Sequence, residues 1–173
     1  MVIFLGLIAE SLNHTLDSLV GKCFYMNRIL DRGVSLLNVK FKMPNTAEVL
    51  HYHGAHVYLG EKFADAIADY QALRDNITMY PATVTGDDDF DKPLSIFLKF
   101  HAENITFESM VLDAIDQAND IGDFATKHFL EKILDNLTEM TGLSKLLVDI
   151  FTDCDNDRFK LLMADSVIKE YIQ

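Results

Sequence analysis

Residues 45–78, NTAEVLHYHGAHVYLGEKFADAIADYQALRDNIT, form the stretch that decides the fold. Pro44 stands directly before it and a second proline follows shortly after it, and proline disrupts the interior of a helix. Asn45 suits the N-cap position, and Glu48, three residues later, can complete a capping box. Apolar and small residues then recur at intervals of three, four or their sums, the period of one helical face. The stretch therefore predicts one long helix over about residues 46–78.

Histidines are concentrated in this predicted helix, which holds three of the six in the chain. The helical period places His53 and His56 on the predicted buried face and His51 off it. Two imidazoles three residues apart on one face are close enough to bind one metal ion. The alternative is that both lie at the edge of the core and form hydrogen bonds with a backbone carbonyl or a facing side chain.

The composition describes a chain of 173 residues with a formal net charge of −12 and 49% hydrophobic residues. Such a chain is long enough for one domain with a substantial core. Its negative charge argues against a broad nucleic-acid surface, which requires lysine and arginine. Two cysteines make no disulfide framework, and the apolar first residues are too few to span a membrane. We therefore expect a cytoplasmic protein with neither a membrane nor a nucleic-acid partner.

Four further helices are predicted from the same periodicity, over about residues 2–41, 94–119, 124–151 and 158–171. One apolar residue per turn points inward along the first of them, which is typical of a bundle helix. That stripe consists of Leu5, Ile8, Leu12, Leu16, Leu19, Cys23, Met26, Leu30, Val34, Leu37 and Phe41. The core face of the 124–151 helix is predicted to include Thr126, Phe129, Leu130, Ile133, Leu137, Met140, Ser144, Leu147, Val148 and Phe151.

An acidic loop is predicted between the second and third helices, at residues 81–93. It carries the aspartates Asp87, Asp88, Asp89 and Asp91. A charge run of this kind is usually a solvated loop, and attraction of cations is the alternative.

The predicted third helix, residues 94–119, carries polar residues within its apolar face. His101, Asn104 and Glu108 lie on or beside that face, at spacings of three, four and seven residues, and Glu103 lies at its other margin. A buried carboxylate without a partner is costly. Glu108 is therefore expected to have a cation, a proton or a hydrogen-bond donor beside it.

The order of the helices, with two long helices, a loop, two more long helices and a short one, resembles that of the ferritins. Short segments are similar to ferritin and mini-ferritin motifs at residues 22–25 (KCFY), 101–106 (HAENIT), 122–126 (GDFAT), 129–130 (FL), 159–165 (FKLLMAD), 51–53 (HYH) and 59–63 (LGEKF). The resemblance implies an all-α fold, a ferritin-like antiparallel four-helix bundle with a long crossover and a short fifth C-terminal helix. It covers nearly the whole chain and implies a single domain over residues 1–173.

Carried over position by position, the resemblance departs from the ferritin metal centre. The first-helix glutamate corresponds to Cys23 and one fourth-helix glutamate to Asn136, while Glu103 and Glu139 retain carboxylates. The second-helix Glu-x-x-His pair has no equivalent with the right spacing. The predicted metal ligands combine these two carboxylates with the polar residues of the second and third helices: His53, His56, His101, Glu103, Glu108 and Glu139.

The resemblance implies an iron-binding protein that forms a homo-oligomer and has metal ions as partners. Iron is expected at a di-iron or mononuclear site, and zinc is the alternative because a histidine-dominated site suits it. The first hypothesis is iron oxidation with storage or detoxification, at a site inside the bundle or between subunits; the sequence leaves open whether the chain is such a ferroxidase.

Two other functions compete with it. One is an assembly or binding module of ferritin fold that has lost its metal centre, which Cys23 and Asn136 favour. The other is a helical enzyme of a different kind that uses Glu108 and His101 as acid and base.

Overall fold

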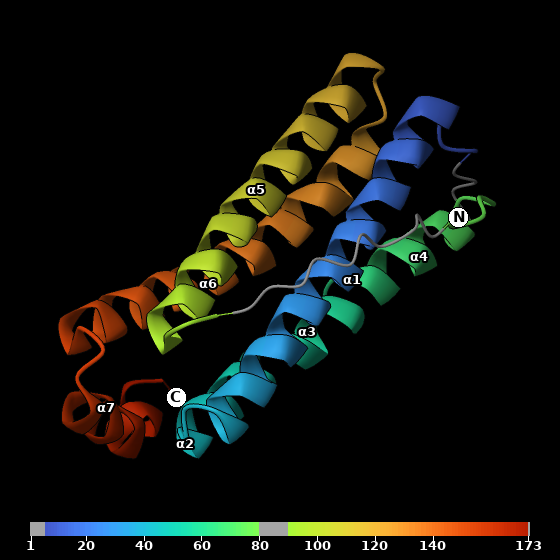
Figure 1. Ribbon diagram of the computed structural model, residues 1–173. Helices are drawn as coiled ribbons and strands as arrows, with labels where there is room; N and C mark the ends of the chain where they lie inside the picture. The colour runs from blue at the N-terminus through green and yellow to red at the C-terminus, as the bar shows by residue number, and fades with distance from the viewer. Residues whose placement is uncertain (1–5, 80–89, 173) are drawn as a thin grey trace.

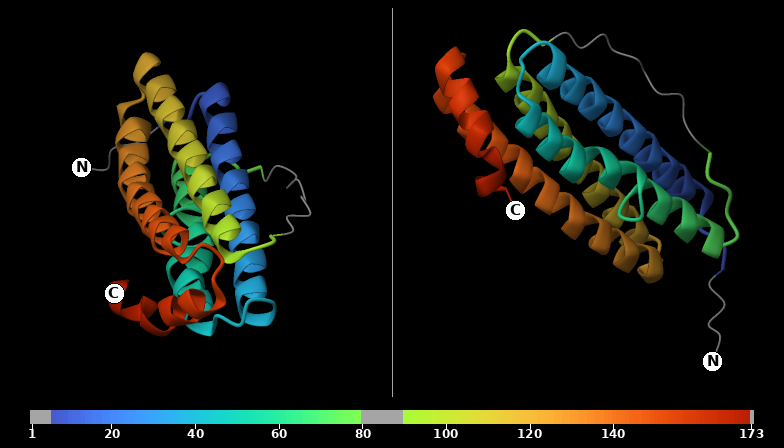
Figure 2. Two further views of the ribbon diagram at one scale, coloured as in Figure 1. Left: turned by 60° about the vertical axis from the view of Figure 1, so that its left-hand side comes forward. Right: turned by 90° about the horizontal axis from the view of Figure 1, so that it is seen from below.

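The structure is a computed structural model that describes residues 6–79 and 90–172. Within these ranges the chain forms helices and no β-strand. Long helical rods run side by side as a bundle, and a shorter helix lies across one end of it (Figures 1 and 2). The helices are α1 (Glu10–Val39), α2 (Pro44–Leu50), the π-helical turn η1 (His51–Ala55), α3 (His56–Leu59), α4 (Ala64–Leu73), α5 (Pro93–Asp120), α6 (Phe124–Cys154) and α7 (Arg158–Tyr171).

The connection between α4 and α5 joins opposite ends of the bundle. Asn76, just after α4, accepts a hydrogen bond through Oδ1 from the backbone N–H of Ile8, near the start of α1 (3.0 Å). The carbonyl of Phe90, just before α5, accepts one from Lys40 Nζ, at the other end of α1 (2.9 Å). The predicted antiparallel four-helix bundle with a long crossover and a short C-terminal helix is therefore confirmed. Three of the crossover's aspartates, at positions 87–89, lie outside the described residues.

The core is built from the apolar stripes that the periodicity predicts. Ten of the eleven predicted inward positions of the first helix lie in the described residues, and nine of these ten are buried; Val34 is partly buried. The helix itself begins at Glu10, later than predicted, because residues 6–9 are not helical. No helix in the described part of the chain is long and apolar enough to cross a membrane.

The second rod of the bundle consists of α2, η1, α3 and α4, whereas the sequence predicts one continuous helix there. The turn η1 inserts a wider π-helical turn, and a non-helical link at residues 60–63 separates α3 from α4. Gly54 lies within the π turn, and its lack of a side chain lets α1 pack closely here, because a Cβ at this position would lie 2.4 Å from a methyl group of Leu30. Gly60 has extended backbone (ψ −161°) and ends α3. The rod also ends at Leu73 instead of residue 78.

The helix α7 caps α2 at the end of the bundle. Asp165 is buried, and its Oδ1 accepts hydrogen bonds from both the backbone N–H and the hydroxyl of Thr46, each 2.7 Å long. No side chain next to α2 in sequence caps it, so the predicted capping box of Asn45 and Glu48 is wrong. A carboxylate at a helix N-terminus satisfies a free amide and interacts favourably with the helix dipole.

Candidate functional site

A neutral hydrogen bond crosses the middle of the bundle. Tyr58 on α3 donates its hydroxyl proton to Asn104 Oδ1 on α5, and both side chains are fully buried. The Asn104 amide donates in turn to the carbonyl of Phe100 (3.0 Å). Phe63 stacks on the Tyr58 ring with the centroids 5.2 Å apart, and Phe107 lies 6.3 Å from it. The middle of the bundle is thus a packed aromatic core with one satisfied polar pair.

Cys23 on α1 adds a thiol to this region. Burial raises the pKa of Cys23 far above its ordinary value, so it carries no charge at neutral pH. Burial also raises the pKa of Tyr58, and the nearby Cys23 and Glu108 add to that increase. The position that corresponds to the first-helix glutamate of ferritins therefore holds a neutral, protonated group.

Glu103, a predicted metal ligand, is paired with two lysines instead. It accepts a hydrogen bond from Lys22 on α1, and Lys99 Nζ lies 3.1 Å from its other carboxylate oxygen. Burial acts to raise the pKa of Glu103, but the bonds from Lys22 and Lys99 outweigh it, so the pKa lies below its ordinary value. Both carboxylate oxygens of Glu103 thus already have cationic partners within the chain.

His101 and Glu108 lie along the seam between α5 and α6, where both are partly buried. His101 Nδ1 is 2.8 Å from Ser144 Oγ, and Thr141 Oγ1 donates to Glu108 Oε1 at 2.5 Å. The hydrogen-bond donor that the sequence predicts for Glu108 is therefore Thr141.

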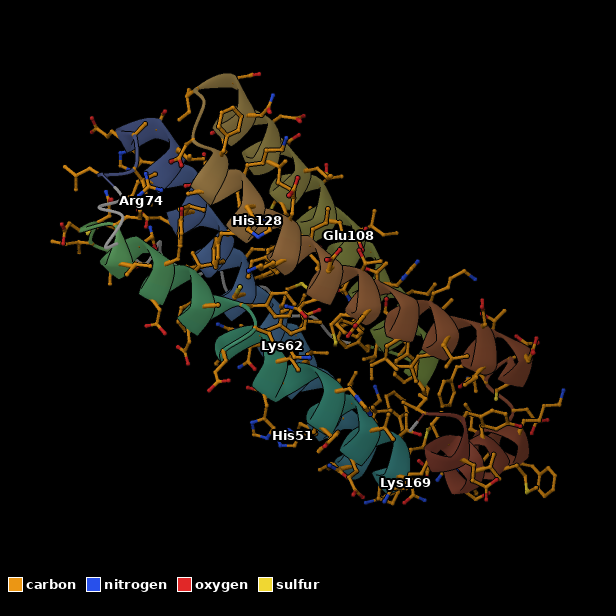
Figure 3. All side chains as sticks on the ribbon, turned by 180° about the vertical axis from the view of Figure 1, so that it is seen from behind. His51, Lys62, Arg74, Glu108, His128 and Lys169 are labelled. Carbon is orange, nitrogen blue, oxygen red and sulfur yellow. The ribbon has the colours of Figure 1, made fainter. Side chains whose placement is uncertain are left out.

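His56 is exposed, so the predicted burial of this residue is wrong. The π-helical turn shifts the helical register before His56 and brings its ring against that of His51, with centroids 4.5 Å apart. His51 is exposed too and points away from the bundle (Figure 3). The extra residue of a π turn explains the error, because the prediction assumed a regular period.

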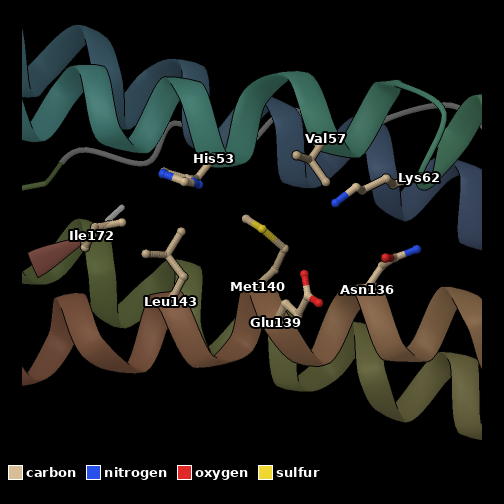
Figure 4. A pocket seen from close by; sticks show the side chains of 8 residues that line it. All are labelled: His53, Val57, Lys62, Asn136, Glu139, Met140, Leu143 and Ile172. Carbon is tan, nitrogen blue, oxygen red and sulfur yellow. The ribbon is translucent and has the colours of Figure 1, made fainter. Parts of the chain in front are cut away.

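His53 and Glu139 line the same pocket between the second rod and α6 (Figure 4). The pocket has a volume of about 220 Å³. Its lining residues are His53, Val57, Lys62, Asn136, Glu139, Met140, Leu143 and Ile172. These two predicted ligands are therefore brought together, whereas none of His101, Glu103 and Glu108 lines the pocket. Across the described ranges, no group of three or more His, Cys, Asp and Glu side chains is arranged to hold a metal ion.

No model of a known protein family matches the chain, and no curated protein matches it by sequence. Its fold, however, matches solved structures closely. An open-pore ferritin from the archaeon Archaeoglobus fulgidus superposes with a TM-score of 0.84 at 17% identity, over 92% of this chain and 96% of that one. The ferritin of Chlorobium tepidum gives a TM-score of 0.80 at 14% identity, over 96% and 100% of the two chains.

The chain has the ferritin-like fold. A humanized archaeal ferritin agrees with this assignment, with a TM-score of 0.84 at 16% identity over 92% of this chain and 94% of that one. The resemblance inferred from the sequence is thereby confirmed at the level of the fold.

The polar groups described above for the middle of this ferritin-like bundle differ in chemistry from the ligands of a paired-iron centre. Such a centre uses carboxylates and imidazoles that project inward from facing helices. Here the inward groups are the Cys23 thiol, the Tyr58 phenol and the Asn104 amide, all neutral and packed among aromatic rings. The thiol is a ligand only after it loses a proton that burial holds strongly.

A charged network at one end of the ferritin-like bundle was missed by the sequence analysis. Arg74, buried at the end of the second rod, donates through Nη1 and Nη2 to the two carboxylate oxygens of Asp123 (3.1 and 3.2 Å). The same guanidinium donates to the hydroxyls of Tyr70 (2.8 Å) and Thr126 (3.2 Å). The sequence contains a pattern that could have predicted its burial. Arg74 follows Ile67 by seven residues, and this spacing places both on the same face of a helix. Figure 3 shows it at this end.

Proposed function

We propose that this chain is the subunit of a ferritin-type homo-oligomer whose bundle interior is a packing core instead of a paired-iron centre. The hydrogen bond between Tyr58 and Asn104, beside the protonated Cys23, carries the proposal. It occupies the region between the facing helices with groups that satisfy one another. Of the two hypotheses based on the resemblance, this supports the assembly module over the ferroxidase.

The charge distribution around Glu103 supports the same choice. An iron ion approaching Glu103 has to displace the ammonium groups of Lys22 and Lys99. It also has to approach two positive charges in a partly buried region, where electrostatic repulsion is poorly screened. Glu103 therefore functions as a structural partner of Lys22, with which it links α1 to α5, and of Lys99 on its own helix.

Homo-oligomerisation is supported by the outer face of α7. Phe159 is 73% exposed, Met163 53% and Leu162 43%, and their spacing of three and four residues puts them on one face. Contiguous exposed apolar residues of this kind mark contact sites between proteins.

The test combines the mass of the purified chain in solution with its rate of ferrous-iron oxidation. We expect a particle of many subunits by analytical ultracentrifugation. We also expect oxidation of a few ferrous ions per subunit to proceed at the rate of the buffer alone. A rapid phase of oxidation that is abolished by Asn104→Leu would overturn the loss of the centre, and a monomer at micromolar concentration would overturn the assembly.

A second candidate function is the capture of a divalent transition metal in the pocket of His53 and Glu139. The observation that favours it is the approach of an imidazole and a carboxylate from facing rods to one pocket of about 220 Å³. Both ligand types suit zinc and ferrous iron. Lys62 lines the same pocket and its charge opposes a cation there.

Calorimetric titration with Zn²⁺ tests this second candidate. We expect binding in the wild-type chain, a loss of affinity of about tenfold or more in His53→Ala with Glu139→Gln, and tighter binding in Lys62→Gln. His128→Ala is the matched control, because His128 is an exposed histidine on α6 away from the pocket lining. Equal affinity in the wild type and the double variant would exclude the site.

A further inference from the structure

His51 and His56 form a pair of imidazoles on the outside of the second rod. Their ring centroids lie 4.5 Å apart with an angle of 72° between the ring planes, and both residues are exposed. Figure 3 shows His51 pointing away from the bundle. Neither residue lines the pocket of His53 and Glu139, so the two form a separate feature of this rod. We call His51 and His56 the histidine pair.

The π-helical turn creates the histidine pair. Residues advance by about 100° each around a regular α-helix, so two residues five apart lie about 140° apart and point to different sides. In a π turn the backbone hydrogen bonds join residues that are five apart, which places such residues one above the other. His51 opens η1 and His56 follows its last residue, so the turn brings the two imidazoles together. Single π turns inserted into α-helices are frequent at functional sites.

The inner side of the same turn is fixed against α1. Gly54 and Ala55 are buried, and Gly54 packs so closely that an added Cβ would lie 2.4 Å from a methyl group of Leu30. Packing therefore holds the backbone that carries the histidine pair, while the exposed side chains change rotamer rapidly. An ion that binds both rings has to fix only two side chains, and a pre-organised backbone lowers the cost of binding.

The separation of the rings fits two ligands of one metal ion. A transition-metal ion binds an imidazole nitrogen at about 2.0–2.1 Å, which puts the centroid of the ligand ring about 3 Å from the ion. Two rings bound at a right or tetrahedral angle then have centroids about 4.5–5 Å apart. The 4.5 Å of the histidine pair lies in this range. The rings meet edge to face, and rotation of the exposed side chains turns a nitrogen of each toward a common point.

Space for the remaining ligands of such an ion lies next to His51. A hollow of about 290 Å³ is lined by His51 together with Asn38 and Glu48. The amide and carboxylate oxygens of these two residues can accept hydrogen bonds from metal-bound water. Water has to complete the coordination, because no third His, Cys, Asp or Glu in the described part of the chain joins the pair to hold an ion.

We propose that the histidine pair is a surface site for a divalent transition-metal ion, with His51 and His56 as its two protein ligands and water as the others. Imidazole nitrogens suit copper, nickel and zinc, and Cu²⁺ binds most tightly among the divalent ions of this series. The site lies outside the bundle. It depends neither on the proposed oligomer nor on the pocket of His53 and Glu139.

Calorimetric titration with Cu²⁺ tests the histidine pair. The starting protein is His53→Ala with Glu139→Gln, which removes the ligands of the other pocket. We expect its tightest binding to involve one Cu²⁺ ion per chain, with a loss of affinity of about tenfold or more in either His51→Ala or His56→Ala. His128→Ala removes an exposed histidine of α6, so it is the matched control and should bind like the starting protein. Affinities of His51→Ala and His56→Ala equal to that of His128→Ala overturn the site.

The double variant distinguishes one shared ion from two histidines that bind separately. When one ion needs both rings, His51→Ala combined with His56→Ala loses little more affinity than either single variant, because the two effects are not additive. Losses that add up in the double variant would show separate binding and overturn the proposal.

Electron paramagnetic resonance of the bound Cu²⁺ gives a second readout. We expect coupling to the nitrogens of two imidazoles in the starting protein and to fewer in His51→Ala. Coupling to a single imidazole in the starting protein also overturns the shared site. Circular dichroism should show unchanged helical content in each variant, since both histidines are exposed.

Discussion

Two polar networks link the second rod to the pair of long helices α5 and α6. One lies at the middle of the bundle and the other at its end. The middle network consists of Tyr58 and Asn104 and is neutral. The end network consists of Arg74, Asp123, Tyr70 and Thr126 and contains a buried ion pair. The two networks thus differ in charge: the one at the end contains an ion pair, whereas the one in the middle, where the fold's resemblance to ferritins predicts a metal centre, is neutral. The charged groups Glu103 and Lys22 are sequence neighbours of Asn104 and Cys23, and they pair with each other between α5 and α1.

The difference follows from what surrounds each network. At the end of the bundle, helix termini supply extra partners. Asp123, for example, also caps α6 by accepting from the backbone N–H of Thr126 (3.2 Å). Arg74 in addition donates to the carbonyl of Gly6. In the middle, no helix terminus contributes to the network: Asn104 accepts from Tyr58 and donates to the carbonyl of Phe100 within α5 (3.0 Å). A charged side chain without a partner would be costly to bury there.

Breaking the ion pair of the end network should have the largest effect. Arg74→Met leaves the Asp123 carboxylate partly buried without its cation, and such a loss typically destabilises a protein by about 3–5 kcal/mol. Urea unfolding followed by circular dichroism measures the change. Arg32→Met, at an exposed position of α1, is the control and should be close to neutral. A loss below about 1 kcal/mol would show that the pair behaves like a surface salt bridge.

Breaking the middle network should cost less. Tyr58→Phe keeps the ring in its aromatic stack and leaves Asn104 Oδ1 buried without its donor, which costs about 1–3 kcal/mol. Tyr171→Phe removes a hydroxyl from an exposed tyrosine and serves as the control in the same urea titration. If Tyr58→Phe proves as stable as the wild type, the hydrogen bond between Tyr58 and Asn104 does not stabilise the fold. The neutral network would then have no measurable role to compare with that of the ion pair.

A carboxylate with no cationic partner among the described residues sharpens the comparison further. Asp165 faces the N-terminus of α2 and accepts both of its hydrogen bonds from Thr46. Asp165→Asn keeps an acceptor but removes the charge, so only the interaction with the helix dipole is lost, about 0.3–1 kcal/mol. Thermal unfolding compared with that of Asp135→Asn, an exposed position within α6, measures it. A stability change as large as that of Arg74→Met would be inconsistent with a dipole effect.

The same ion pair should also give an acid dependence, which Asp123 contributes. Burial acts to raise the pKa of Asp123, but hydrogen bonds from Arg74 and Thr126 outweigh it and the pKa is lowered. A carboxyl with a lower pKa in the folded chain stabilises it fully above its unfolded pKa, roughly 4. That stabilisation is lost as the pH falls through the folded pKa. Unfolding free energies of wild type and Asp123→Asn, measured between pH 6 and pH 3, should therefore converge at acid pH. Parallel curves would contradict this.

The sequence was sufficient for the parts of the fold that depend on one regular period. Of the ten predicted core positions of α6, eight are buried and two, Phe129 and Val148, are partly buried, since α6 is an uninterrupted helix of 31 residues. The bounds of α7 match the prediction because Asp157 is a local N-cap that accepts from the backbone N–H of Lys160 (3.1 Å). Periodicity and local capping are encoded within a few residues.

The candidate site depended on information that lies elsewhere in the chain. Whether His56 faces inward depends on the π turn at His51–Ala55, an irregularity that a regular helical period does not predict. The charge of Glu103 is paired with that of Lys22, which lies 81 residues away in sequence. Metal binding by the predicted ligands remains a prediction, and only His53 and Glu139 share a pocket.

The contact between Thr46 and Asp165 joins residues 119 positions apart. During synthesis on the ribosome, the amide at the start of α2 therefore has no carboxylate to bond until almost the whole polypeptide has been made. Long sequence separations of this kind slow folding, because a large loop must close before the contact forms. The hydrogen bonds at the start of α2 are thus completed only after the last helix has been synthesised. A chain truncated before residue 165 lacks the carboxylate that accepts from Thr46.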